Sequence, residues 1–207
     1  QRATVLDAMG DPRVLAAYDA AIAVADTDEV DELRPLQALA QIKQGDPAGA
    51  LETLAGCEPR TLDSRLARAL TFSGAALLGA TGPETGSLLS ADGRRLALRS
   101  GDPSAVVVAS WSQAAAAHAR GELRSSLFSD LADTHALPAL AVSVFDGQLC
   151  ITQRLLYGDR PYADVIGFAD RFIAEATRLG AARGVAFGTT LRGEAELLSG
   201  DLDAARR

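Results

Sequence analysis

The sequence predicts an all-α fold, an α-solenoid of about five to six helical hairpins that forms a single domain over residues 1–207. Glycine turns recur at intervals of 35, 37, 39, 37 and 42 residues. Ala- and Leu-rich stretches with helical spacing lie on both sides of each turn. One turn per period, with a helix before and after it, is the signature of a helical repeat. The turn glycines are Gly10, Gly45, Gly82, Gly121, Gly158 and Gly200.

The spacing predicts ten helices within this array. The runs 105–108 and 141–145 resemble strands, but each continues into a stretch that favours a buried helix. The ranges of the ten expected helices are 12–25, 29–44, 47–56, 60–78, 84–99, 103–119, 122–133, 138–157, 161–179 and 182–199.

Proline, aspartate and glycine predict where these helices begin and end. Proline fits the first helical turn because no N–H is needed there, and a preceding aspartate can cap the free N–H groups. A glycine before them can adopt the left-handed conformation that ends the previous helix. Gly101 has the same chemistry out of phase, so we expect it to join one repeat to the next. The expected first-turn prolines are Pro12, Pro47, Pro103 and Pro161, and the expected caps are Asp11, Asp46 and Asp102.

The composition excludes several classes of protein. Hydrophobic residues make up 48 % of the chain and aromatic residues only 5 %, so Ala, Leu and Val must fill the core. The net charge is −7 and Lys43 is the one lysine, so we expect no direct binding to nucleic acid. Neither a signal peptide nor an apolar run of membrane-spanning length is present, which predicts a cytoplasmic protein without a membrane partner. Cys57 and Cys150 are far apart in the sequence and read as reduced, buried thiols.

Both ends cut through the repeat pattern. Residues 1–9 are too few for a full first helix, and residues 201–207 barely begin another one. The chain does not begin with Met, and neither end has the polar helix that caps natural arrays. We therefore expect a segment of a longer protein.

Small residues recur where tetratricopeptide repeats need them. When each turn glycine is placed at position 15 of a 34-residue unit, position 20 is small in every unit except at Leu15. Position 8 is small at Ala38, Ala114 and Gly193, and Cys57 occupies the small position 27. This pattern resembles the tetratricopeptide fold, although the period is longer and most of its large aromatic residues are missing. The small residues at position 20 are Ala50, Ser87, Ser126, Ala163 and Ala205.

A narrower resemblance covers about 45 residues near the C-terminus. Residues 169–187 (ADRFIAEATRLGAARGVAF) lead into residues 191–205 (LRGEAELLSGDLDAA). This stretch resembles the helical-repeat region of large ATP-dependent, LuxR-family (MalT-like) transcriptional regulators of high-GC actinobacteria. In that family a P-loop ATPase domain precedes the repeats and a LuxR-type helix-turn-helix follows them. Neither domain is present here, so the resemblance implies a sensing or interaction role, with DNA bound only through a domain outside this chain.

No motif for catalysis or metal binding stands out. The loop 79–87 resembles a phosphate-binding loop, but it lacks the lysine and the preceding strand, so it reads as an inter-helix connection. His118 and His135 have no metal-ligand spacing with the cysteines, and no Gly-x-Ser-x-Gly is present. The acidic run 26–32 reads as a solvated helix start. We expect neither an enzyme nor a cofactor.

The candidate binding site comes from the geometry of stacked hairpins. The first helix of each hairpin lines the concave face of such an array, and aromatic anchors with polar neighbours there suit a ligand or a peptide. The competing interpretation is that the aromatic residues fill the core between helices. The residues mapped to this face are Phe72, Trp111, His118, Phe145, Gln148, Thr152, Phe187, Thr190 and Glu194, beside Ala115.

The expected function is that of a sensor or protein-interaction domain of a bacterial transcriptional regulator. A small inducer or a partner protein would bind the concave face and shift the array between two curvatures. The first alternative is a tetratricopeptide-like adaptor that binds a peptide and has no role in transcription. The second is a helical enzyme that uses Glu194, Glu196 or His118.

Overall fold

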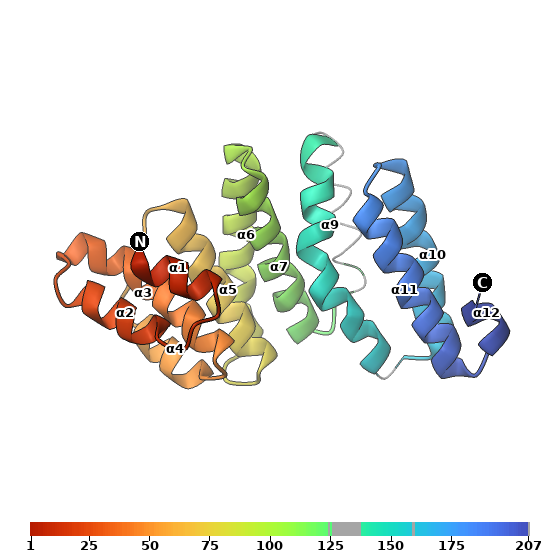
Figure 1. The fold of residues 1–207 in the computed structure, drawn as a ribbon, viewed down its shortest axis with the longest axis horizontal. Helices are drawn as coiled ribbons and strands as arrows, with labels where there is room; N and C mark the ends of the chain where they lie inside the picture. Colours follow the sequence, from red (N-terminus) through yellow and green to blue (C-terminus); the bar gives the residue numbers. More distant parts are fainter. Residues whose placement is uncertain (124, 126–137, 159, 207) are drawn as a thin grey trace.

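The structure is a computed structural model and describes residues 1–123, 125, 138–158 and 160–206. Over these residues the chain forms eleven α-helices and one 3-10 helix, and no strand. The helices follow one another along the long axis of an elongated molecule, from the N-terminal to the C-terminal end (Figure 1). The prediction of an all-α chain is confirmed. No helix in the described ranges is both long and apolar enough to cross a membrane.

The expected helices match the observed ones closely in the middle of the chain. The ranges 103–119 and 182–199 are reproduced by α7 and α11, and 138–157 divides into α9 and η2. The expected helix 122–133 falls largely outside the described residues, as do His135 and Ser126. The helices are α1 (Arg2–Ala8), α2 (Val14–Ile22), α3 (Thr27–Lys43), α4 (Pro47–Thr53), α5 (Leu62–Leu77), α6 (Pro83–Ser100), α7 (Pro103–Ala119), α9 (Pro138–Thr152), η2 (Gln153–Tyr157), α10 (Tyr162–Arg178), α11 (Ala182–Ser199) and α12 (Leu202–Arg206).

Two of the three expected aspartate caps are confirmed. The Asp46 carboxylate accepts a hydrogen bond from the Gly49 N–H at 2.9 Å, and the Asp102 carboxylate accepts one from the Ser104 N–H at 2.9 Å. The third cap was wrong, because α2 begins only at Val14. Asp11 instead accepts hydrogen bonds from the backbone and the guanidinium of Arg13, and this pair closes a separate turn before the helix.

Of the four prolines expected in first helical turns, two are confirmed and two are not. Pro47 and Pro103 occupy the first turns of α4 and α7, as predicted. Pro12 lies before α2, and Pro161 is the residue that precedes the first turn of α10, so both were placed inside their helices incorrectly. The start of α3 is well capped, since Asp26 and Glu29 form a reciprocal capping box there. The acidic run 26–32 is thus a helix start, as expected.

Four of the six repeat glycines end their helices in the left-handed conformation, namely Gly10, Gly45, Gly121 and Gly200. The other two do not: Gly82 has φ −70° as the N-cap of α6, and Gly158 has φ −83°. After α5 the left-handed position belongs to Gly79 instead, three residues earlier than expected. Residues 79–82 connect α5 to α6, so the interpretation of 79–87 as an inter-helix connection holds for this part, whereas residues 83–87 form the first turns of α6.

The helices pack in an ordered series. Helix α5 contacts α3, α6 and α7, helix α7 also contacts α6 and α9, and α10 lies against α11. One continuous apolar core runs from α5 to α11, whereas α1 to α4 contribute to two smaller clusters. Much of the main core is alanine, as the composition predicts.

Glycines allow close approach at three helix crossings. A Cβ on Gly86 of α6 would lie 3.0 Å from the Ser73 N atom of α5, and one on Gly147 of α9 would lie 2.4 Å from the Val107 carbonyl oxygen of α7. A Cβ on Gly188 of α11 would lie 2.7 Å from the Ile173 side chain of α10. The small-residue pattern of the sequence did not include these glycines, and its own positions are buried only in part. Ala38, Ala50 and Ala114 are fully buried, but Ala163 is exposed in the first turn of α10, where it separates no pair of helices.

Candidate functional site

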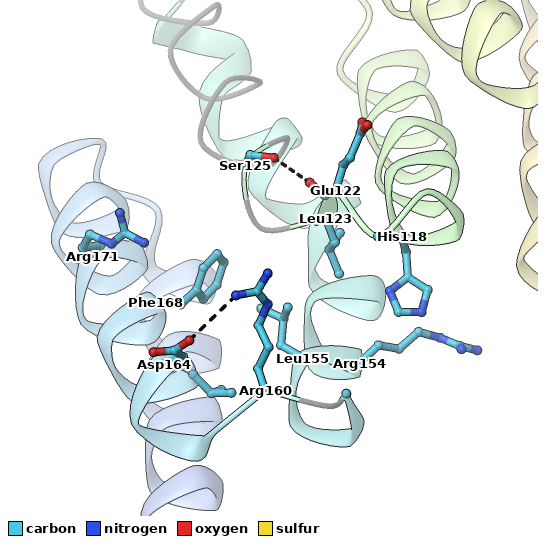
Figure 2. A pocket seen from close by; sticks show the side chains of 13 residues that line it. His118, Glu122, Leu123, Ser125, Arg154, Leu155, Arg160, Asp164, Phe168 and Arg171 are labelled. Atoms are coloured by element: carbon cyan, nitrogen blue, oxygen red, sulfur yellow. Dashed lines mark hydrogen bonds and ion pairs between the residues drawn. The ribbon is translucent and has the colours of Figure 1, made fainter. Parts of the chain in front are cut away.

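A cavity of about 610 Å³ opens at the C-terminal end of α7, where this helix meets η2 and the beginning of α10 (Figure 2). Pockets that hold small ligands in proteins have volumes of about 300 to 1,000 Å³. The side chains around the cavity include cationic, anionic and apolar groups. We therefore take it as the candidate binding site.

Local structure brings these side chains together. His118 lies in the last turn of α7, and Gly121, with φ +73°, turns the chain so that Leu123 lines the cavity. The short helix η2 contributes Arg154 and Leu155 from the other side. The chain then turns again into α10.

The first turns of α10 present one mixed face to the cavity. Arg160, Asp164 and Phe168 are four residues apart, and Arg171 follows three residues later. Within α10, the spacing of Asp164, Phe168 and Arg171 places them on one side of the helix, and Arg160 lies in the turn before it. All four line the cavity.

The apolar part of the cavity lining belongs to the main core. Leu123, Val165 and Phe168 are buried, and Leu155 is partly buried. The Phe168 ring stacks on that of Phe172 with a centroid distance of 5.8 Å, so its place is fixed from behind by the core. Leu155 is the side chain of this group that keeps exposed surface against which a flat or aliphatic group can pack.

The charges around the cavity are unequal. Three arginines, Arg154, Arg160 and Arg171, line it together with two carboxylates, Glu122 and Asp164. Glu122 forms an ion pair at 2.6 Å with Arg120, and the Arg160–Asp164 pair is long, at 3.8 Å. Among the described residues of the lining, arginines therefore outnumber carboxylates by one.

His118 lies beside one of these arginines. Burial lowers the pKa of its imidazole, and the nearby Arg154 guanidinium lowers it further. The free imidazole is therefore favoured in its neutral form near neutral pH, in which one ring nitrogen donates a hydrogen bond and the other accepts one. Together these groups can bind and orient a small molecule.

The residues predicted for binding lie in several places. Phe72 packs on the small cluster of α3 and α4, and Trp111 and Phe187 are partly buried against the main core. The Phe187 ring meets Phe172 edge-on at 6.2 Å. Thr152 is buried at the end of α9. The side chains of Phe145 and Gln148 lie outside the described part of the chain, although both positions belong to α9.

Two predicted residues share another hollow. Thr190 and Glu194 line a cavity of about 440 Å³ between α11 and α12, together with Leu197 and Leu202. His118 lines the larger cavity, so the structure divides these three residues between two sites. Glu196 is buried and pairs with Arg192 at 2.9 Å. The binding role of the predicted residues on α5 and α11 stays a prediction.

Sequence reasoning missed Arg154, Arg160 and Phe168. The available signal was the spacing of Asp164, Phe168 and Arg171, which places an acid, an aromatic ring and an arginine on one side of a helix start, with Arg160 just before it. The contribution of η2 carried no such signal, because it depends on where α9 tightens into a 3-10 helix.

The described residues contain no group of three or more His, Cys, Asp or Glu that could hold a metal ion. Cys57 is buried at the end of α4 with its thiol 3.5 Å from the Thr53 carbonyl oxygen. In comparisons with known proteins, no protein-family model, curated protein or solved structure matches this chain.

Proposed function

We propose that this chain is a helical-repeat sensor domain that binds a small molecule in the cavity at the end of α7. The cavity is the observation that carries the proposal, since its volume and mixed lining suit a small ligand. The repeat architecture, an α-solenoid of tetratricopeptide-like hairpins, is supported by the glycine period and by the packing of α3 on α5, α5 on α7 and α7 on α9.

The position of the cavity suits a sensor. It lies where the C-terminal end of α7 meets η2 and α10, so a ligand would touch successive parts of the array at once. Such a ligand stabilises the arrangement that fits it and shifts the population toward it. In a solenoid each unit contacts its neighbours, so a change at one joint alters the curvature of the whole array.

The regulatory context of the proposal rests on residues 169–205, which resemble MalT-like regulators. In that context the array would pass its change of curvature to ATPase and DNA-binding domains encoded on either side. The sequence of the complete open reading frame tests this. A P-loop domain upstream and a LuxR-type helix-turn-helix downstream support a regulator, and unrelated or missing neighbours contradict it.

Ligand binding in the cavity is tested by a thermal-shift screen of small metabolites against the wild type and Leu155→Trp. The Trp side chain fills the cavity, because Leu155 lines it. Leu88→Trp is the matched control, since Leu88 is 75 % exposed on α6. We expect compounds that stabilise the wild type and Leu88→Trp but not Leu155→Trp, because binding to the native state raises stability. The absence of any such compound would overturn the proposal.

The adaptor function is a second candidate, favoured by the hollow between α11 and α12. Leu197 and Leu202 are about half exposed there beside Thr190 and Glu194. An apolar peptide side chain would fit between them, with polar groups at the rim. Loss of peptide capture in Leu197→Asp, with ligand binding at α7 unchanged, would assign peptide binding to this hollow. Unchanged capture would refute it.

A further inference from the structure

We infer that the ligand of the cavity at the end of α7 is an organic anion, a molecule with a flat apolar body and one carboxylate or phosphate group. The inference rests on the proposed function and names the chemical class of the ligand. It comes from the division of the lining into an apolar part and a cationic side.

The cationic side is formed by Arg154 and Arg160, which come from different elements and extend in different directions (Figure 2). Arg154 extends from η2, and Arg160 projects into the cavity from the turn before α10 (Figure 2). A guanidinium presents planar N–H groups that match the two oxygens of a carboxylate or a phosphate. Arg160 is also available for such a contact, because its ion pair with Asp164 is long, at 3.8 Å, and about half exposed.

The interaction between Arg154 and His118 supports the same sign of charge. Burial lowers the pKa of the imidazole most, and the Arg154 guanidinium lowers it further. An anion bound between the two groups would neutralise the guanidinium charge and accept a hydrogen bond from the imidazole. A cationic ligand would add to the repulsion.

The apolar part of the lining indicates the chemistry of the ligand body that lies beside the anionic group. Phe168 and Leu155 face the cavity from opposite sides, and Leu123 closes it near α7 (Figure 2). Leu123 and Phe168 are only 3 % and 1 % exposed, so the apolar surface open to a ligand is mainly that of the partly buried Leu155. Burying apolar surface of a ligand against it is favourable. A ligand that carries both parts is therefore favoured, and a ring system of two fused rings fits within about 610 Å³.

The test is isothermal titration of the whole chain with three probes that share one ring system: 1-naphthoate, 1-naphthyl phosphate and the neutral 1-naphthamide. We expect at least one anionic probe to bind the wild type tenfold or more tightly than naphthamide, and its affinity to fall with added salt. Higher affinity for 1-naphthoate would assign a carboxylate to the ligand, and higher affinity for 1-naphthyl phosphate would assign a phosphate.

Matched variants locate the effect. Arg160→Gln should reduce the preference for the anionic probe to threefold or less, with naphthamide binding unchanged. Arg99→Gln removes the same charge from the exposed end of α6, at the opposite end of α7, about 25 Å away for a helix of 17 residues. This control should keep the full preference.

Equal binding of all three probes would overturn the anionic class while leaving small-molecule binding in place. The same holds if Arg160→Gln keeps the full preference. Failure of all three probes, together with a metabolite screen that finds neutral ligands dependent on Leu155, would also overturn the anionic class alone. A screen without any ligand would overturn the proposed function itself.

Discussion

The body of α7 and its C-terminal end differ in how their neighbours meet them. Along the body, small residues let α5, α6 and α9 approach closely, and three buried hydroxyls, those of Ser73, Ser90 and Ser112, bond to one another between α5, α6 and α7. At the C-terminal end the neighbours are large and charged, and they leave a cavity of about 610 Å³.

The contrast shows how one helix can serve two purposes. Glycine, alanine and serine allow helices to touch without gaps, so the body of α7 is closed and stabilises the array. The arginine and histidine side chains at the end cannot pack in this way, because their polar groups require solvent or a partner. We therefore expect changes along the body to lower stability, and changes at the end to alter binding.

Among these variants, Gly147→Ala should cause the largest loss of stability, because it disturbs the close packing along the body of α7. The new Cβ would lie 2.4 Å from the Val107 carbonyl oxygen and 2.7 Å from the Ser110 Cβ, so α9 must move away from α7. We expect the free energy of unfolding to fall by about 1–3 kcal/mol, as for other overpacked cores. Chemical denaturation measures this.

The matched control is Gly167→Ala. Gly167 lies within α10, and a Cβ there would meet nothing within 4 Å. This change should raise the free energy of unfolding by up to about 1 kcal/mol, because alanine favours a helix. Equal stability of the two variants would contradict close packing of α7 on α9.

Substitutions of two serines of α7 should have smaller effects on stability, and the two effects should differ in sign or size. Ser112→Ala removes a hydroxyl that lies 2.6 Å from that of Ser90, and should cost about 1 kcal/mol of stability. Ser110→Ala removes a buried hydroxyl for which the described residues provide no partner, so it should leave stability unchanged or raise it. Thermal and urea denaturation of both variants, side by side, check the sign. A larger loss in Ser110→Ala would refute the role of the serine cluster.

The open end should show a dependence on pH through His118. Burial and Arg154 lower the pKa of its imidazole in the folded state below the usual 6.5, so the unfolded chain takes up this proton first as the pH falls. The contribution of His118 to stability is therefore complete above the unfolded pKa and decreases on acidification below it. His118→Gln should flatten the stability curve between about pH 7 and pH 5. Parallel curves for the two proteins would contradict the assignment.

Arg160→Gln should have the smallest effect on stability. Its partner Asp164 is 3.8 Å away, and both side chains are about half exposed. Exposed pairs of this kind contribute about 0–1 kcal/mol, so we expect a change of less than about 0.5 kcal/mol in urea denaturation. A larger loss would show that Arg160 holds η2 and α10 together and is structural.

The sequence predicted the fold better than the site, for physical reasons. Helix period and capping are local, so Asp46, Asp102 and the bounds of α7 followed from neighbouring residues alone. The cavity depends on contacts between residues far apart in the sequence, such as His118, Arg154 and Phe168. Projecting residues onto an ideal concave face also ignores local changes of helix geometry, and η2 is such a change.

The most direct measurement is a crystal structure of the chain with 1-naphthoate or 1-naphthyl phosphate, whichever binds more tightly. We expect the ring between Leu155 and Phe168, the anionic group within hydrogen-bond distance of the Arg160 guanidinium, and the body of α7 unchanged. A ring bound elsewhere, or an anionic group turned away from both Arg154 and Arg160, would contradict the assignment of the end of α7 as an anion-binding site.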